Sequence, residues 1–575
     1  MTALGRARDD AWIARSDELA APVVELYALA APESASSLGL TQADARTADY
    51  RPGWRDRVRE AGFRATETLR AAESSEPDPR VREDIGILLR AVDETVLGLD
   101  VADRHLLELI DVPRTVFAGV RVLLDEQNPP QRKRLAVERL RRYAGLDGAT
   151  PLAEAAETET RTRFGLAALC PPYAVEVRTS LALGPVLLDG IASLFEGSGL
   201  DGWREAFDAL AAQCATYAAF VEREIVPRAR DDHRLPPEVY ADRLRDVGVD
   251  VAPDELARTA HAAFDAIQAE MQQLAPRVAA EIGSSASDYR DVARELKRRQ
   301  IRGDGDAIVA FYRQRLEEIE AIVRRENIVT LPAQPARIRI ASVAESAEMP
   351  AAHMNPAPLV GNTGQVGEFV LPLDVPPAPG GSGTERPDDF THEAVSWTLT
   401  AHEARPGHEV QFDRMLERGL SLARAVFAFN SVNVEGWALY AEAVMLPHMP
   451  LPAQLSSLQM RLHRAARAFL DPELQSGAIT PDEANAFLQR EIVYSAPTAR
   501  SEVERYTFRS PGQAASYFYG YTKLVALRAE TEAALGDRFD ACAFHDFILD
   551  QGLIPPDALR AAVLERFVPS AGATG

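Results

Sequence analysis

Several features that carry function in other proteins are scarce in this chain of 575 residues. Its three cysteines, Cys170, Cys214 and Cys542, lie far apart in apolar surroundings, which excludes a disulfide framework or a thiolate metal site and is typical of a reducing compartment. No 18 uncharged apolar residues run together, and the first residues, "MTALGRARDDAWIARSDE", contain no apolar segment of signal-peptide length. We therefore expect a soluble, cytoplasmic protein with no membrane partner.

Positive charge is also in deficit. The chain has 63 Lys and Arg against 86 Asp and Glu, and the resulting net charge of −23 is spread along the sequence. This balance argues against nucleic acid and anionic membranes as partners. The length far exceeds what one hydrophobic core supports, so we expect two or more domains or one large helical body. Whether the chain forms a homo-oligomer is left open.

Residues 1–325 read almost entirely as helix. Stretches such as "VREDIGILLRAVDETVLGL" and "YAAFVEREIVPRAR" carry apolar residues at intervals of three and four, and "EQNPPQ" and "RLPPE" separate the helices. No repeat of fixed period is present. We predict that this region is a helical scaffold that forms one wall of a cleft.

Residues 326–575 begin with a different pattern. Between Asn327 and Leu373, the segments "IVTLP", "RIRIASV" and "GEFVLPL" are short, β-branched and bounded by proline or glycine, which predicts a small antiparallel sheet. Residues 374–389, "DVPPAPGGSGTERPDD", predict a mobile surface loop, either a lid or a passive linker. Helix then resumes to the end, and we predict that this region is the metal-binding catalytic part.

The stretch "TAHEARPGHEVQ", Thr400 to Gln411, resembles a stretched zinc motif. Zinc hydrolases commonly take two histidines four residues apart on a helix, with a glutamate after the first as general base. His402 and His408 are six residues apart, which on a straight helix points them about 120° away from each other. A regular helix therefore cannot aim both imidazoles at one ion.

Two residues inside the motif change this expectation. Pro406 lacks an N–H and clashes with the carbonyl of His402, so the helix must break or bulge there. Gly407 permits the backbone angles of such a bulge, which can bring His408 back beside His402. The motif then offers two ligands and Glu403 as the general base. The alternative is a helix end with two surface histidines and no metal.

A second segment supplies acids for the same centre. "NVEGWALYAE" predicts a helix on which Glu435 and Glu442, seven residues apart, share one otherwise apolar face. Buried carboxylates need a metal or a cation as partner. We favour Glu435 as the third metal ligand and Glu442 as the acid that holds a ligand in place. Alternatively, both pair with arginines such as Arg461 or Arg467.

A third segment, "SYFYGYTKLVALR", places Tyr517, Tyr521 and Arg528 on one helical face. Tyrosine hydroxyls suit an oxyanion, and arginine suits a substrate carboxylate. Two alternatives remain open. The aromatic stripe is simply part of the core, or Arg528 pairs with an acid of the protein such as Glu502 or Glu504.

These motifs together resemble a known family. "HEARPGH", "EGWALYAE", "PGQAASYFYGYTKLVALR" and "FHDFILDQGLIPPDALR" are similar to the bacterial family known as domain of unknown function 885, and "LPPEVYADRLRDVGVDVAPDELARTAHAAFDAI" is a weaker match. The resemblance extends from about Tyr217 to Val568, whereas roughly the first 200 residues match only loosely.

The resemblance implies a mainly α, zincin-like body of the glutamate type with a deep cleft, akin to thermostable carboxypeptidases and thimet oligopeptidases. It implies the following roles: His402, His408 and Glu435 as metal ligands, Glu403 as base, and Tyr517 and Arg528 at family positions.

Two further positions concern the limits of this resemblance. Family members often carry a histidine where this chain has Gln475, which weakens any role assigned there. His545 matches the family pattern, but it lies in an amphipathic terminal helix, and we expect it to be structural.

From the sequence we predict a zinc-dependent hydrolase with one zinc per chain. Glu403 takes a proton from zinc-bound water and returns it to the leaving amine, while Tyr517 or Tyr521 donates to the oxyanion. The substrate is a peptide or small amide laid along the sheet by strand addition. One alternative is a metal-dependent enzyme of specialised metabolism acting on a non-peptide substrate, and another is a non-catalytic binding protein.

Overall fold

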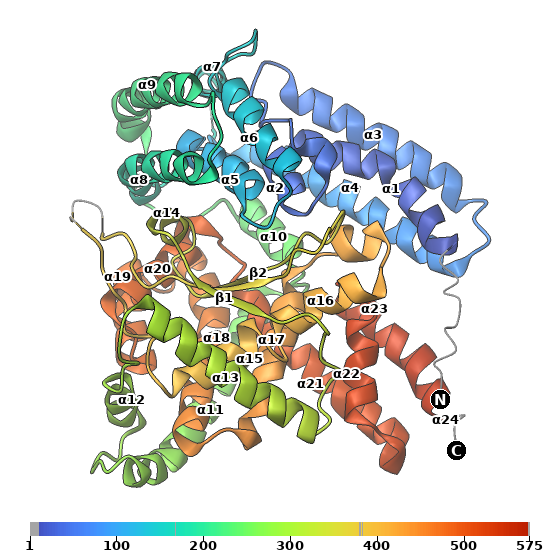
Figure 1. Cartoon of the computed structure of the whole chain (residues 1–575), viewed down its shortest axis with the longest axis vertical. Helices are drawn as coiled ribbons and strands as arrows, with labels where there is room; N and C mark the ends of the chain where they lie inside the picture. Colours follow the sequence, from blue (N-terminus) through green and yellow to red (C-terminus); the bar gives the residue numbers. More distant parts are fainter. Residues whose placement is uncertain (1–10, 167, 379–380, 382, 573–575) are drawn as a thin grey trace.

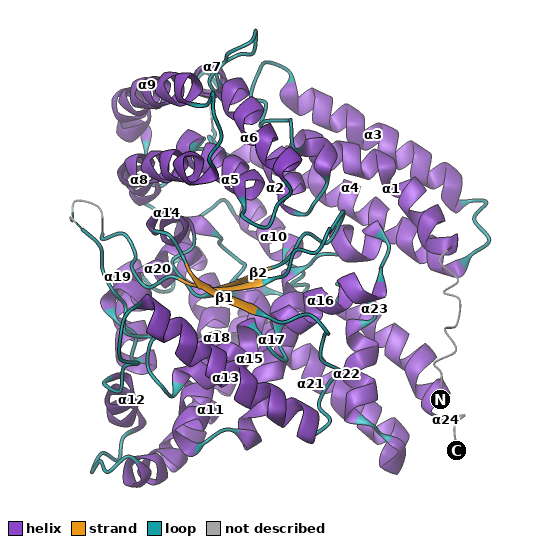
Figure 2. Ribbon diagram, in the orientation of Figure 1, coloured by secondary structure: helices purple, strands orange, loops and turns teal. Residues whose placement is uncertain are grey.

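A computed structural model of the chain describes residues 11–166, 168–378, 381 and 383–572. Nearly all regular structure in these residues is helical, and a single small sheet lies near the middle of the molecule (Figure 2). The prediction of a mainly α protein is confirmed.

The helices before position 221 gather on one side of the sheet (blue to teal in Figure 1). They are α1 (Ala11–Ala30), α2 (Pro32–Ser37), α3 (Trp54–Glu73), α4 (Pro79–His105), α5 (Val112–Leu124), α6 (Pro130–Tyr143), α7 (Leu152–Arg163), α8 (Ala174–Ser198) and α9 (Arg204–Phe220).

Most of the later helices lie on the other side of the sheet in the same view (Figure 1). They are α10 (Pro237–Asp246), α11 (Pro253–Glu281), α12 (Tyr289–Lys297), α13 (Gly305–Arg325), α14 (Val343–Glu348), α15 (Val395–Glu403), α16 (His408–Arg418), α17 (Ser431–Met445), α18 (Leu451–Ser476), α19 (Pro481–Phe487), α20 (Ala496–Glu504), α21 (Ala515–Leu535), α22 (Ala541–Leu549), α23 (Pro556–Ala562) and α24 (Val568–Gly572).

Short π- and 3-10 segments join or extend these helices. They are η1 (Thr41–Ala43), η2 (Val221–Ile225), η3 (Val226–Arg228), η4 (Ala423–Phe427), η5 (Leu446–His448), η6 (Leu488–Ile492), η7 (Arg505–Arg509), η8 (Gly536–Arg538) and η9 (Val563–Phe567).

The sheet has three strands, β1 (Arg337–Ile340), β2 (His353–Asn355) and β3 (Glu368–Leu371), in the order β1-β3-β2. β1 runs parallel to β3 and β2 runs antiparallel to it, so the sheet is mixed and the prediction of an antiparallel sheet is wrong. The physical reason is the connection: the chain between β1 and β3 contains α14 and β2, which gives it the length to return in the same direction. The segment "IVTLP" forms no strand.

The sheet packs directly onto the motif helix. Phe369 and Leu371 share a buried cluster with Tyr312 of α13, Leu399 of α15 and Ala404. Burying these apolar side chains together fixes the end of α15, which carries the first histidine of the motif, against the sheet.

Larger buried clusters join distant parts of the chain. One combines Leu19 and Leu88 with Trp437 and Phe544, so its residues come from both sides of position 325. The predicted division into residues 1–325 and 326–575 is therefore a prediction about roles, while the core crosses that boundary.

Helix α17 lies unusually close to α21, and two glycines make this possible. A Cβ added at Gly520 would lie 2.0 Å from the backbone oxygen of Val432, and one at Gly436 would lie 2.7 Å from the Cα of Gly520. Only glycine fits at both positions, because any side chain would push the helices apart. Glu435 of α17 and Tyr517 of α21 line the same cavity across this crossing.

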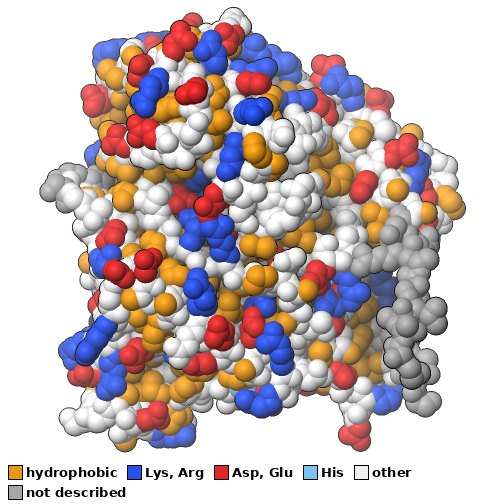
Figure 3. All heavy atoms as spheres, in the orientation of Figure 1, with side chains coloured by type: hydrophobic (Ala, Val, Ile, Leu, Met, Phe, Trp, Pro, Cys, Tyr) orange, Lys and Arg blue, Asp and Glu red, His pale blue; other side chains and the backbone are white. Residues whose placement is uncertain are grey.

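One described helix, α8, is long and apolar enough by length and composition to cross a membrane. It packs against α5, and 33% of its 18-residue apolar window is buried. Acidic and basic side chains are interspersed over the face seen in Figure 3, without a large field of one sign.

The predicted mobile loop 374–389 lies partly outside the described residues, because 379–380 and 382 are not described. Its two ends are joined by an Asp374–Arg386 ion pair and by backbone hydrogen bonds between Val375 and Glu385. The buried Asp389 carboxylate pairs with Lys297 at 2.7 Å, which anchors the C-terminal end.

Candidate functional site

The motif helix breaks where the sequence predicts. α15 ends at Glu403 and α16 begins at His408, with a turn over the four residues between them. A Cβ at Gly407 would lie 1.9 Å from the backbone oxygen of His402, so the turn needs glycine. The Trp437 indole N–H donates to the carbonyls of Pro406 and Gly407 at 3.1 Å and holds the turn.

This turn brings the two imidazoles together. The ring centroids of His402 and His408 are 4.8 Å apart, with the rings nearly perpendicular. Both side chains are buried, so they are not surface histidines at a helix end. Ligand atoms of His402, Glu403 and His408 all lie within 4.8 Å of one another, which makes this group a candidate metal site.

Glu435 completes the group from α17. Its Oε2 atom lies 3.6 Å from Nε2 of His402 and 3.4 Å from Nε2 of His408. These contacts are too long for strong hydrogen bonds, and Oε2 is buried without a hydrogen-bond partner. Burial alone would raise the pKa of Glu435, but the two imidazoles outweigh it and hold this pKa well below its ordinary value.

Glu442 lies behind the first histidine. Nδ1–H of His402 donates to Oε1 of Glu442 at 2.7 Å, and the Thr398 hydroxyl donates to the other oxygen. Arg464 lies 3.8 Å from the same carboxylate. This bond orients Nε2 of His402 toward Glu435 and His408. Burial would lower the pKa of His402, but the neighbouring carboxylates of Glu435 and Glu442 raise it to about 9.

Glu403 is the second acid that faces the histidines. It is buried beside them, and burial raises the pKa of its carboxyl group, the charges of His402 and His408 opposing this only in part. A carboxyl group with a raised pKa is suited to accept a proton and give it back near neutral pH.

These residues open into a cavity of about 730 Å³, called here the large cavity. Its volume lies in the range of sites for small ligands and short peptides, about 300–1,000 Å³. Asp111, which caps α5, and Arg114 of α5 line it together with Glu176 and Thr179 of α8. Further lining residues come from 348–354 and 356, from α15 to α17, from η7 and from α21. Burial raises the pKa of Glu176 to about 7.

Of the two predicted tyrosines, only Tyr517 lines the large cavity. Its ring is parallel to that of His402, with centroids 6.3 Å apart, and the Arg467 guanidinium lies 4.4 Å from its centre. Tyr521 is one turn further along α21, beside Arg461. It therefore does not share the position of Tyr517 at the cavity wall.

Arg528 also lies away from the large cavity. It pairs with Glu532 at 2.7 Å and donates to the hydroxyl of Tyr440 at 2.9 Å. Eleven residues of helix separate it from Tyr517, a rise of about 16 Å, so a shared face does not place both at one site. The proposed alternative partners, Glu502 and Glu504, do not bind it either.

The sequence reading missed three residues of the site. Thr398 was detectable, because it precedes His402 by one helical turn and so shares its face. Arg464 and Arg505 come from α18 and η7, which no motif linked to the histidines. Gln475 and His545, in contrast, make structural hydrogen bonds, to the carbonyls of Tyr506 and Ile328 respectively.

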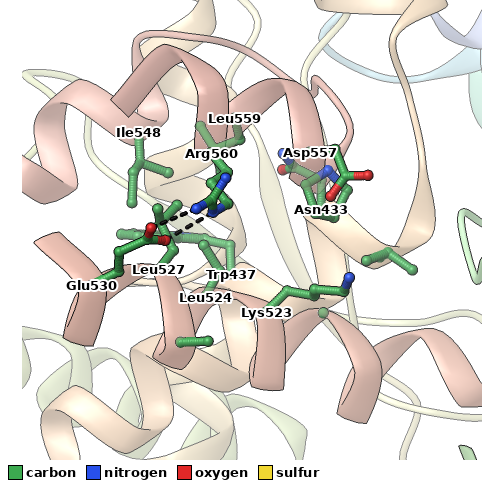
Figure 4. A pocket seen from close by; sticks show the side chains of 14 residues that line it. Asn433, Trp437, Lys523, Leu524, Leu527, Glu530, Ile548, Asp557, Leu559 and Arg560 are labelled. Atoms are coloured by element: carbon green, nitrogen blue, oxygen red, sulfur yellow. Dashed lines mark hydrogen bonds and ion pairs between the residues drawn. The ribbon is translucent and has the colours of Figure 1, made fainter. Parts of the chain in front are cut away.

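A smaller cavity of about 120 Å³ adjoins the same helix α17 and shares no lining residue with the large cavity. Its wall includes Asn433 and Trp437, and apolar side chains of α21 to α23 (Figure 4). Two of its four charged residues are paired with each other, Arg560 being bound to Glu530 at 2.5 Å, and Lys523 and Asp557 also line it.

The comparisons with known proteins agree with this architecture. The family model described as "Bacterial protein of unknown function (DUF885)" matches residues 32–563. A protein from Colwellia psychrerythraea, described as a "putative lipoprotein", matches with a TM-score of 0.75 and 18% identity over 96% of this chain and 99% of that one. A "putative lipoprotein of unknown function" from Shewanella oneidensis matches with a TM-score of 0.72 and 19% identity over the same shares, 96% and 99%.

These two likenesses show the fold. No curated protein matches the chain.

Proposed function

Since the chain belongs to the bacterial family of unknown function DUF885, its activity has to be inferred from the site, and we propose that it is a zinc-dependent hydrolase that cleaves a peptide or small amide bond. The metal ligands are Nε2 of His402, Nε2 of His408 and Oε2 of Glu435. Glu403 is the general base, and one zinc is bound per chain.

The position of the Glu435 carboxylate carries this proposal. Zinc binds nitrogen and oxygen ligands at about 2.0–2.1 Å in tetrahedral geometry, which puts ligand atoms about 3.3–3.4 Å from one another. Oε2 of Glu435 lies 3.6 and 3.4 Å from the two imidazole nitrogens, close to those edges. A buried carboxylate oxygen without a partner is costly, and a cation at this point removes the cost.

The donor set also fits zinc in kind. Two imidazoles and one carboxylate are the ligands of catalytic zinc sites that keep a fourth position open. Glu442 holds His402 through Nδ1, as carboxylates do for metal-bound histidines. Between the two available acids, Glu435 fits as the ligand because its oxygen touches both histidines, which leaves Glu403 free for proton transfer.

A zinc ion held there would supply Lewis-acid chemistry, lowering the pKa of a bound water and polarising a carbonyl group. Glu403 accepts the proton of the attacking water at a carboxylate oxygen and passes it to the nitrogen of the leaving amine. Burial raises the pKa of Tyr517, so its hydroxyl stays protonated and can donate to the developing oxyanion.

The sheet offers a place for the substrate backbone. β2 is an edge strand, and its residues His353 and Met354 line the large cavity. An extended peptide would pair with this edge by strand addition and lie across the histidines. The cavity also admits small amides, so an enzyme of specialised metabolism with a non-peptide substrate remains the second candidate.

The test is turnover by protein purified without added metal. We expect hydrolysis of members of a mixed peptide library or of a panel of small amides, removed by chelation and restored by zinc. Products from the small-molecule panel alone would favour the second candidate. Zinc-loaded protein that hydrolyses neither set would contradict the proposal.

The compartment is part of the proposal. We keep the cytoplasmic location predicted from the sequence, whereas the descriptions of the two solved structures read "putative lipoprotein". Fractionation of cells that express the native gene decides between cytosol and membrane.

A further inference from the structure

One wall of the large cavity is rich in arginine. Arg505 and Arg509 of η7 both line it, one helical turn apart. Their surroundings differ. Arg509 has a carboxylate of its own, because Nε and Nη2 both contact Oε2 of Glu504, at 2.9 and 2.8 Å. Its charge is therefore neutralised inside the protein.

Arg505 has no such partner. Its Nη1 donates to the side-chain oxygen of Gln513 at 2.8 Å, a neutral group. Among the described residues, the one carboxylate within 4.0 Å of its guanidinium is Glu502, and that contact, from Nε to Oε1, is itself 4.0 Å. An interaction at this distance is not a hydrogen bond.

Both carboxylate oxygens of Glu502 are already bound by other groups. Arg467 binds it through two nitrogens, at 2.6 and 2.9 Å, and the hydroxyl of Tyr506 donates to it at 2.7 Å. His463 adds a contact at 3.1 Å. Two guanidinium groups thus share one carboxylate, and Arg467 holds both of its oxygens. A positive charge remains on Arg505 at the cavity wall.

We propose that Arg505 binds a carboxylate group of the substrate in the large cavity. The inference rests on the proposed function and names the substrate class of that site. Arginine presents several N–H donors in one plane and binds carboxylates through two parallel hydrogen bonds. The Arg505 side chain is 18% exposed, so it is held firmly yet reaches the cavity. A charge in such a place is costly unless the ligand pairs with it.

The charge lies near the metal site. Arg505 and Glu435 line the same cavity together with Tyr517. Burial would lower the pKa of Arg505, but the negative charges around it, that of Glu435 included, keep this pKa above its ordinary value. A substrate carboxylate held here lies on the side of the cavity where Tyr517 faces the histidines. It is either the C-terminal carboxylate of a peptide or an acidic side chain near the bond that is cleaved.

The test uses one peptide in four forms: with a free or an amidated C-terminus, each with glutamate or glutamine as the last residue. Wild type is compared with Arg505→Gln and Arg505→Lys, after zinc content and melting temperature show that the fold is kept. A charged hydrogen bond contributes about 1.5–3 kcal/mol, so we expect Arg505→Gln to lose about tenfold or more in kcat/KM on the forms that carry the recognised carboxylate and to change little on the amidated glutamine form, which has none. Loss confined to free C-termini identifies an exopeptidase, and loss confined to glutamate identifies side-chain recognition.

Two controls isolate the effect. Arg509→Gln changes an arginine of the same wall that already has a carboxylate, and Arg528→Gln changes one outside the cavity. Both should leave the preference for carboxylate over amide within about twofold of wild type. Equal losses on all four peptides in Arg505→Gln would overturn the inference.

A binding measurement keeps this result separate from the proposed function. Calorimetry with N-acetyl-phenylalanine and its amide, on zinc-loaded wild type and Arg505→Gln, needs no turnover. We expect wild type to prefer the acid and the variant to lose that preference. If nothing is hydrolysed but the preference is present, the proposed function fails and the carboxylate site stands. If hydrolysis occurs but neither the kinetics nor the calorimetry shows a preference for carboxylates, the carboxylate site is refuted and the proposed function stands.

Discussion

The two cavities beside helix α17 contrast in how their polar groups are satisfied. In the small cavity, Arg560 is bound to Glu530 (Figure 4), and the side chain of Asn433 hydrogen-bonds to Gln411 and to the carbonyl of Ile554. In the large cavity, buried atoms of Glu435, His408 and Thr179 have no hydrogen-bond partner. Among the described residues, none that lines the small cavity has a buried side-chain N or O atom without a hydrogen-bond partner, whereas three that line the large cavity do.

This difference in hydrogen bonding indicates which cavity binds a ligand. A buried polar atom without a partner costs about 1–3 kcal/mol, so such an atom at a cavity wall marks a place where a ligand would restore a missing interaction. Glu435 and Glu442, seven residues apart on α17, show the same contrast. Oxygen atoms of Glu442 accept from His402 and Thr398, while Oε2 of Glu435 accepts nothing. We infer that Glu442 supports the site and that Glu435 binds the metal.

The largest expected effect comes from Glu403→Gln. The amide cannot accept a proton from water, so the rate should fall by about two orders of magnitude or more. Zinc content should stay at the wild-type value, because Glu403 is not one of the proposed ligands. Glu409→Gln is a control on the same motif, since Glu409 faces Arg405 instead of the histidines. Near-normal turnover in Glu403→Gln would make this residue structural.

The next largest effects are expected on zinc binding, where substitutions of the two acids of α17 should differ. Glu435→Ala removes a ligand and should abolish zinc binding at stoichiometric concentrations, measured by metal analysis after dialysis. Glu442→Ala leaves all three ligands and should weaken zinc affinity by about 10- to 100-fold, because His402 loses the bond that orients it. The opposite order of effects would exchange the two roles.

A smaller effect is expected at the crossing of α17 and α21. In Gly520→Ala the new Cβ meets the backbone oxygen of Val432, so we expect a loss of about 1–3 kcal/mol in stability and weaker zinc binding. Gly86→Ala in α4 is the matched control, because nothing lies within 4 Å of its Cβ. It should stabilise the protein by up to about 1 kcal/mol. Equal urea midpoints for the two variants would show that α17 tolerates the shift.

The smallest effect is expected for Arg528→Lys. Its partners are the partly exposed Glu532 and the hydroxyl of Tyr440, and such a pair contributes up to about 1 kcal/mol. Turnover of acid and amide substrates should change by the same small factor. A selective loss on free acids would return Arg528 to the substrate site and contradict its position in the structure.

The sequence predicted the parts of the site that depend on local chemistry. Pro406 and Gly407 break the helix by steric rules, which hold wherever the helix packs. Glu435 and Glu442 share a face because seven residues complete about two turns. Helical periodicity gives the angle of a side chain around its axis but not its depth along a cavity, and Arg528 was misplaced for this reason.

Other features depend on contacts that no short segment contains. β2 has only the residues "HMN", too few for an alternating pattern, and the pairing of β1 with β3 is decided by the intervening chain. The charge of Arg505 is left without a close carboxylate because Arg467 pairs with Glu502 instead. That pairing depends on how α18 packs against η7.

The central claim is a zinc ion between His402, His408 and Glu435, and metal analysis of protein purified without added metal tests it most directly. We predict about one zinc per chain in wild type and almost none in His402→Ala or His408→Ala. His261→Ala, which removes a half-exposed histidine paired with Glu473, should keep its zinc. Full zinc occupancy in both motif variants, or a metal-free wild type that also fails to take up zinc, would contradict the account.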